Sequence, residues 1–207
     1  MPYRKDHGSD KGSVVGKLAS FCHATAVTRD AITAPADDPT ASGCYAIKDA
    51  KAQPKLVKRS VTIVDAFRTA AYHLKKAARL CVPSSVGSTP PQSMTRLKCY
   101  KIAKAKGTPA FVPVRVTLDD GFDTRIVDVT TPSEVCAIVD LGTTFKDVSG
   151  GFICYGIKDA KTSPKQPKLA PRTLEVDNVF YPGAPPADTR FVTLEKQKQL
   201  CVGADVL

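Results

Sequence analysis

Three cysteines, each followed by tyrosine, recur along this chain of 207 residues at a constant spacing of 55 residues: Cys44, Cys99 and Cys154. A second set of cysteines follows mostly large apolar residues, and two of its members are also 55 residues apart: Cys22, Cys81, Cys136 and Cys201. Cys201 comes 65 residues after Cys136, so the third copy carries ten extra residues. Self-similarity at a fixed period is the signature of a protein built from copies of one small unit.

The segments between these cysteines have the pattern of β-strands. Residues 59–64 and 114–118 alternate apolar with polar side chains, which is typical of half-buried strands. An Asp-x-Phe segment follows each of them and predicts a turn, as at Asp65 and Asp120. Residues 70–80 contain good helix formers, but their equivalents in the second copy are β-branched, so we expect a strand there too. The sequence therefore predicts an all-β fold of tandem small antiparallel β units stapled by disulfides, because each unit alone buries little apolar area.

The repeat boundaries divide the chain into four parts. Residues 44–83, 98–139 and 153–205 are the three repeats, and residues 1–43 are interpreted as the remnant of an upstream repeat or as an assembly arm. The segment that ends at Cys22 has the form of a closing end without its opening Cys-Tyr. We favour truncation or a plain free thiol over completion by another subunit. A closed three-fold barrel is the rival architecture, but the additional closing end favours an open array.

Two disulfide schemes respect the repeat. In the first, each repeat is closed internally and Cys22 is left over: Cys44–Cys81, Cys99–Cys136 and Cys154–Cys201. In the second, the bonds span the junctions and Cys201 is left over: Cys22–Cys44, Cys81–Cys99 and Cys136–Cys154. The entropy of loop closure does not separate the schemes. We favour the internal scheme, since it makes each copy self-sufficient, and expect Cys22 to be unpaired or intermolecular; buried reduced cysteines are the alternative, which the strict phasing disfavours.

The best copy of the repeat runs from Cys44 to Pro83 and reads Cys-Tyr-x-Ile-Lys, then Val-x-Ile-x-Asp-x-Phe, then Leu-Cys-x-Pro. Over residues 44–205 the chain resembles a repeat found in tandem in uncharacterised bacterial extracellular or cell-envelope proteins. The third copy departs from this pattern by its insertion and by Gly203 at the position of Pro83. The resemblance implies secretion and a β-rich fold, and it carries no established activity.

The sequence contains no recognisable catalytic or metal motif. It lacks nucleotide-binding glycine loops, a serine-nucleophile elbow and the zinc-protease histidine pair. The three histidines lie outside repeat-equivalent positions, and no second Cys/His pair at zinc spacing accompanies Cys22-His23: the histidines are His7, His23 and His73. Turn hydrogen bonding accounts for the carboxylates at the turns better than a calcium site does: Asp65, Asp119 and Asp120. We therefore expect a protein that is not an enzyme, with no catalytic residue, cofactor or metal.

The tyrosines beside the opening cysteines are the most regular aromatic residues: Tyr45, Tyr100 and Tyr155. With neighbouring lysines they could form a stacking stripe for sugars or bases. A tyrosine beside a disulfide more commonly packs over it and hydrogen-bonds its hydroxyl locally, and we favour this interpretation. The aromatic motif of RNA-binding sheets is missing, so nucleic acid is not favoured as a partner.

The chain is basic, with a net charge of +10, but its basic residues are scattered as on a solvated surface. No apolar run is long enough for a membrane-spanning helix. The first twenty residues lack the apolar core of a signal peptide. We therefore expect a removed export signal, a start inside a longer reading frame, or reduced thiols in the cytosol.

Together these features predict a secreted or cell-surface structural or adhesive protein. As a subunit of a surface fibre, it would self-assemble into a head-to-tail oligomer or filament. The alternative is a secreted binding module for acidic polysaccharide or another polyanion, which would use the basic surface.

Overall fold

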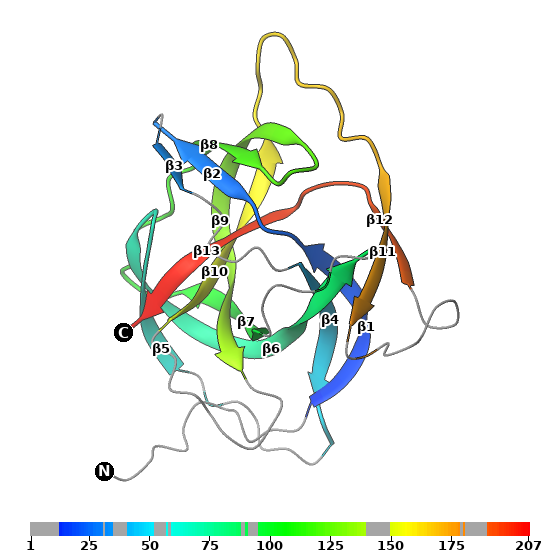
Figure 1. Ribbon diagram of the computed structural model, residues 1–207. Coiled ribbons are helices and arrows are strands. Elements are labelled where there is room, and N and C mark those ends of the chain that lie inside the picture. The colour runs from blue at the N-terminus through cyan, green and yellow to red at the C-terminus, as the bar shows by residue number, and fades with distance from the viewer. Residues whose placement is uncertain are drawn as a thin grey trace.

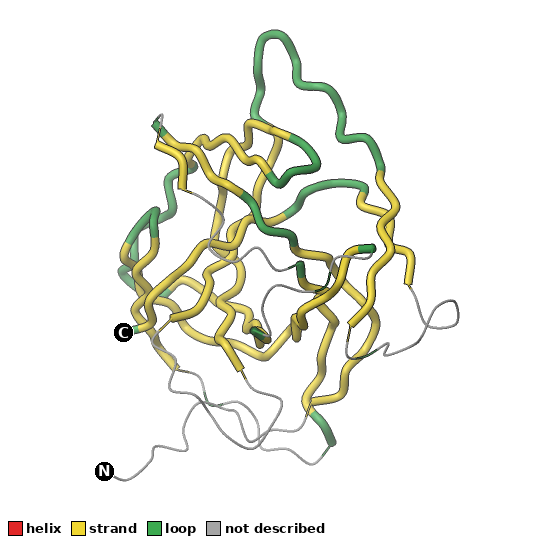
Figure 2. The backbone as a smooth tube through the Cα atoms, in the orientation of Figure 1, coloured by secondary structure: helices red, strands yellow, loops and turns green. Residues whose placement is uncertain are grey.

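The computed structural model describes residues 13–30, 32–34, 41–51, 57, 59–87, 90, 95–139, 150–178, 180 and 190–207. This part of the chain folds into thirteen β-strands and no helix (Figure 1; Figure 2). In chain order they are β1 (Ser13–Cys22), β2 (Ala26–Arg29), β3 (Ile32–Ala34), β4 (Ser42–Asp49), β5 (Arg59–Asp65), β6 (Thr69–Val86), β7 (Arg96–Lys104), β8 (Val114–Asp119), β9 (Thr124–Val139), β10 (Gly150–Asp159), β11 (Arg172–Asn178), β12 (Arg190–Leu194) and β13 (Gln199–Val206). The prediction of an all-β, antiparallel fold is confirmed.

Side-chain alternation explains these strands. In β8, Val116 and Leu118 are buried, while the side chain of Arg115 on the other face is exposed to solvent. The ambiguous segment 70–80 lies in β6, where Ala70 and Tyr72 alternate into the core. The strand prediction for this segment is confirmed, because a two-residue period suits a sheet face and not a helix.

Each repeat pairs an opening strand, which carries Cys-Tyr, with a closing strand, which carries the second cysteine. The opening strands β4, β7 and β10 pair antiparallel with the closing strands β6, β9 and β13. In all three pairs the cysteines lie directly opposite one another: Cys44 with Cys81, Cys99 with Cys136, and Cys154 with Cys201. Directly opposed residues of an antiparallel pair have their Cβ atoms close together, so this register brings the sulfur atoms within bonding reach.

The repeats join into one sheet instead of standing as separate units. The closing strand β6 pairs on its other edge with β7, and β9 likewise pairs with β10. β13 pairs with β5 of the first repeat, so the strands β5, β6, β7, β9, β10 and β13 form a closed ring of antiparallel pairs. The expectation of an open array was wrong. Closure satisfies strand edges that an open array would leave unpaired.

β1 occupies the position of a fourth closing strand. It pairs with β4 so that Cys22 lies opposite Ser42. In the equivalent junctions Cys81 lies opposite Leu97 and Cys136 opposite Phe152, which is the same register. The irregularities of pairing also recur at matching positions in the three junctions. Among the described residues there are therefore four closing strands but three opening strands.

Beyond their cysteines, the closing strands β6 and β13 reach across the ring. The end of β6 pairs with β11 of the third repeat, and the end of β13 pairs with β5 of the first. β2, which follows β1, pairs in the same way with β8 of the second repeat. Repeats one and three are thus opposite each other, and the second repeat is opposite β1.

One close backbone approach gives a stability test. A Cβ atom on Gly151 of β10 would lie 2.5 Å from the carbonyl oxygen of Cys136, whereas one on Gly150 would meet nothing within 4 Å. Gly151→Ala should lower the free energy of unfolding by about 1–3 kcal/mol, because the two strands must separate to admit the methyl group. Gly150→Ala is the matched control. Urea unfolding measures both, and equal stability of the two variants would contradict this register.

Candidate functional site

The disulfide sulfurs gather in one cluster inside the ring. The bonds join Cys44 to Cys81, Cys99 to Cys136 and Cys154 to Cys201, with S–S distances of 2.02, 2.03 and 2.04 Å. These are the pairs of the internal scheme, and Cys22 is the cysteine left over. The sulfur atoms of Cys136 and Cys154, which belong to different bonds, are 3.8 Å apart. The closeness of the bonds follows from the common register of all three repeats.

Cys22 belongs to the same cluster. Its Sγ lies 3.5 Å from Sγ of Cys44, which is bonded to Cys81. Burial of the sulfur raises the pKa of the Cys22 thiol above its ordinary value, while the nearby Arg79 guanidinium partly offsets this effect. The thiol is therefore protonated at neutral pH, and it reacts as a nucleophile only when it loses that proton.

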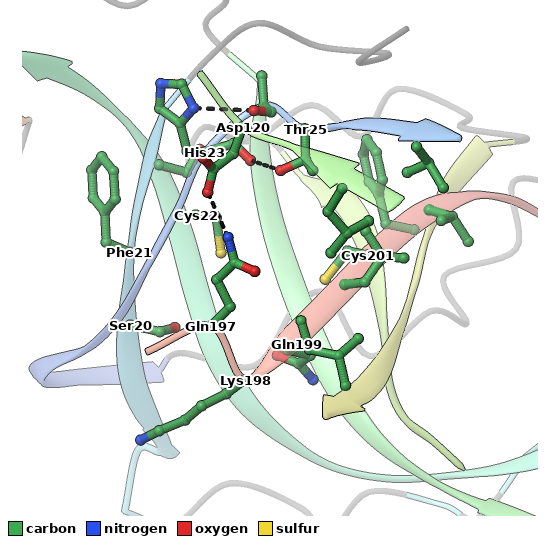
Figure 3. Close-up of a pocket in the computed structure, with 18 of the residues that line it drawn as sticks. Ser20, Phe21, Cys22, His23, Thr25, Asp120, Gln197, Lys198, Gln199 and Cys201 are labelled. Atoms are coloured by element: carbon green, nitrogen blue, oxygen red, sulfur yellow. Dashed lines mark hydrogen bonds between the residues drawn. The ribbon is translucent and has the colours of Figure 1, made fainter. Parts of the chain in front are cut away.

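A cavity of about 1010 Å³ opens beside Cys22 (Figure 3). Residues 19–24 at the end of β1 line it on one side, and residues 193–203 before and within β13 line it on another. Its volume is at the upper end of the roughly 300–1,000 Å³ that small-molecule pockets occupy. In Figure 3 the sulfurs of Cys22 and Cys201 come to the cavity from these different strands.

Both strands present unpaired backbone to this cavity, as far as the described residues show. β1 pairs with β4 and with no other described strand. β13 pairs with β10 over Gln199–Asp205, but on its other edge it pairs with β5 only from Ala204 onward. Unpaired strand edges are templates for a further strand.

The turns that follow β5 and β11 form sockets for tyrosine. Tyr155 donates a hydrogen bond of 2.8 Å to Oδ2 of Asp65, and its ring meets Phe67 edge-on with centroids 5.2 Å apart. Oδ1 of Asp65 accepts a hydrogen bond from the backbone NH of Phe67, which shapes the turn. We name such a pair, an Asp or Asn with the Phe two residues later, a tyrosine socket.

The third repeat has a socket of the same construction. Asn178 Nδ2 donates a hydrogen bond of 2.8 Å to the Tyr45 hydroxyl, and Phe180 meets the Tyr45 ring edge-on at 5.0 Å. Oδ1 of Asn178 accepts from the backbone NH of Phe180. Repeats one and three therefore exchange tyrosines across the ring, with each tyrosine almost fully buried.

The socket of the second repeat faces the cavity and holds other groups. Oδ1 of Asp120 accepts from the backbone NH of Phe122, as in the other two sockets. Its Oδ2 accepts a hydrogen bond of 2.8 Å from Nε2 of Gln197, which Figure 3 shows. The ring of His23 packs on Phe122 with centroids 4.7 Å apart. Gln197 and His23 thus occupy the places that a tyrosine hydroxyl and ring take elsewhere.

A polar cluster at the axis ties the four closing strands together. Its members stand two residues before the closing cysteines: Ser20, Arg79, Glu134 and Gln199. The Arg79 guanidinium donates to Ser20 Oγ at 2.9 Å, to Gln199 Oε1 at 2.6 Å and to the Glu134 carboxylate. Only 14% and 11% of the Arg79 and Glu134 side chains are exposed, so this is a largely buried ion pair.

The structure also places the other residues that the sequence singled out. Tyr100 is buried, which raises its pKa to about 12, so with Tyr45 and Tyr155 it packs inside instead of forming an exposed stripe. The hydroxyl partners of Tyr45 and Tyr155 come from the opposite repeat, not from local residues as expected. His73 contacts Ser60, and His7 lies outside the described residues. No group of three potential metal ligands occurs among the residues that the structure describes.

Sequence reasoning missed several residues of the site. Asp120 was interpreted as a turn residue, which is correct for one oxygen atom only. Arg79 and Gln197 were not singled out, and neither was Phe122 as a cavity residue. The repeat alignment gave a signal for Phe122, since it matches Phe67. It gave none for Gln197, whose equivalents are Ala77 and Pro132.

Comparison with protein-family models, with curated proteins and with solved structures found no match to this chain.

The buried ion pair gives a second stability test. Arg79→Met should lower the free energy of unfolding by about 3–5 kcal/mol, because the Glu134 carboxylate remains buried without its partner. Replacing both residues by Met should recover most of this loss. Arg115→Met, which opens the exposed pair with Asp128, is the control and should leave the urea midpoint nearly unchanged. A double variant no more stable than Arg79→Met would contradict the account.

Proposed function

We propose that the protein is an extracellular structural or adhesive subunit that joins its neighbour at the cavity between β1 and β13. One observation carries the proposal. Three closing strands have a disulfide-bonded opening strand beside them, while β1 has a free thiol and a cavity there. A vacant strand position is the kind of join that fibres use when one subunit completes the sheet of the next.

The disulfides support an extracellular setting. Bonds of this kind form and persist in oxidising compartments and are rare in the cytosol. Six of the seven cysteines are bonded, and each bond closes a stretch of 37 or 47 residues. Within the described residues, we find no helix with the length and hydropathy needed to cross a bilayer. Secretion or display at a cell surface fits both observations.

The contacts of the cavity favour a structural role over catalysis. His23 bonds to the Ala24 carbonyl through Nδ1 and packs on Phe122, so these contacts account for it without a role in activating Cys22. The carboxylate of Asp120 is engaged with its own turn and with Gln197. The lining thus combines apolar side chains, sulfur atoms and polar or charged groups, of which His23 and Asp120 are engaged in internal contacts.

The alternative of a polyanion-binding module receives less support. Arg79 and Arg125 are largely buried and direct their guanidinium groups to carboxylates of the same chain: Glu134 for Arg79, and Asp123 and Asp159 for Arg125. Arg115 is exposed but is paired with Asp128. Part of the positive charge is therefore used inside the fold.

Assembly can be tested with protein secreted into an oxidising compartment. Non-reducing electrophoresis should show covalent adducts larger than 22.1 kDa that collapse to 22.1 kDa on reduction, and sedimentation should show large species independent of salt. Cys22→Ser should abolish the covalent adducts without unfolding the chain. Wild-type protein that stays monomeric at every concentration, or that binds heparin in a salt-dependent way, would contradict the proposal.

A further inference from the structure

We propose that the cavity receives a specific partner segment: an opening strand of the repeat type, with Cys-Tyr at its centre, presented by a partner polypeptide. This inference rests on the proposed function and names the segment that the neighbour contributes. The cysteine of that strand would bond to Cys22, and its tyrosine would enter the socket of Asp120 and Phe122.

The order of the strands leaves room for one more opening strand. Around the axis, closing and opening strands alternate as β1, β4, β6, β7, β9, β10 and β13. The sequence of neighbours therefore has a closing strand at both ends, and the cavity lies between those two strands. One opening strand in this position would pair with both edges and complete the alternation.

The register of the existing pairs defines the register that this strand would adopt. Each opening cysteine lies opposite a closing cysteine on one side. On its other side it lies opposite a member of the polar cluster: Ser20 for Cys44, Arg79 for Cys99, and Glu134 for Cys154. Cys22 on β1 and Gln199 on β13 are the two equivalent positions with no opening cysteine opposite them. Residues of both strands line the cavity.

The socket of the second repeat holds no tyrosine. The opening-strand tyrosines of repeats one and three enter each other's sockets across the ring. β2, which follows β1, pairs with β8 of the second repeat. The second repeat therefore lies across the ring from β1, just as repeats one and three lie across the ring from each other. A tyrosine following the incoming cysteine would therefore reach Asp120 and Phe122. It would displace Gln197 from the carboxylate and His23 from the ring.

A partner polypeptide is a better source of this strand than a second copy of the chain. The three opening strands of this chain are each paired on both edges: β4 with β1 and β6, β7 with β6 and β9, and β10 with β9 and β13. A second copy would have to release one of these strands, at the cost of its own disulfide. A partner polypeptide with a spare opening strand fits the cavity without that cost.

The covalent step is a thiol–disulfide exchange. The Cys22 thiol loses its proton to solvent, and the thiolate attacks the sulfur of an incoming cysteine held in a mixed disulfide with a small thiol. The bond from Cys22 to the incoming cysteine forms, the mixed disulfide breaks, and the small thiol leaves with the electron pair and takes up a proton. The redox state is conserved.

A peptide supplies the test. The sequence of Ser42–Asp49 is synthesised with its cysteine as a thiopyridyl mixed disulfide and added to the folded chain at mildly alkaline pH. Release of thiopyridone gives the rate, and peptide mapping gives the site. Controls are a scrambled peptide that retains the activated cysteine, a peptide with Tyr45→Ala, and protein with Cys22→Ser.

The native peptide should react with Cys22 about tenfold faster or more than the scrambled one, because strand pairing and the socket hold it in place. The Tyr45→Ala peptide should lose most of this advantage, and so should protein with Phe122→Ala. Equal rates for native and scrambled peptides, or labelling of Cys22 only after denaturation, would overturn the inference. If Phe122→Ala does not fold, the peptide variant alone decides.

The two proposals fail separately. A monomeric chain that nevertheless takes the native peptide selectively would contradict self-assembly but support the strand-accepting site. Covalent adducts through Cys22 combined with no selectivity among peptides would support assembly through Cys22 and would overturn the opening-strand inference.

Discussion

The fold depends on a disulfide between directly opposed residues of two antiparallel strands, repeated three times. A strand that slips by one residue turns every side chain to the other face of the sheet, so register is the property that each repeat must secure. The bonds Cys44–Cys81, Cys99–Cys136 and Cys154–Cys201 each hold one pair of residues opposite each other. With the register held, Tyr45 and Tyr155 point inward, and the closing strands bring Arg79 and Glu134 together.

The same register explains the candidate site. β1 pairs with β4 in the same register in which β6 pairs with β7, so Cys22 lies at the position of a closing cysteine. A cavity lies beside it in place of a bonded opening strand. The turn at Asp120 lies at the position of a tyrosine socket, and Gln197 hydrogen-bonds to the Asp120 carboxylate there. Two independent features, one covalent and one aromatic, thus point to the same absent strand. A cavity that arose by chance between loops would have no reason to show both.

Side-chain alternation was enough to predict the strands, and the cysteine spacing was enough to predict the repeat and the favoured pairing, because these depend on contacts within one repeat. Closure of the ring could not be predicted, since the pairing of β13 with β5 joins residues at opposite ends of the repeat array. The sockets could be predicted only in part. Asp65, Asp120 and Asn178 align in sequence, but the contact between Tyr155 and Asp65 depends on closure of the ring of strands. Gln197 could not be predicted from the repeat, because the equivalent positions hold Ala77 and Pro132.

The most direct test of this account is a map of the native disulfides by mass spectrometry after proteolysis without reduction, with free thiols blocked first. In the unassembled chain of 22.1 kDa, free thiol should be found at Cys22 alone, with the three bonds inside the repeats. The sulfurs of Cys22 and Cys44 are only 3.5 Å apart, so the competing connectivity is within reach and the measurement discriminates. Bonds Cys22–Cys44, Cys81–Cys99 and Cys136–Cys154 with Cys201 free would contradict the account.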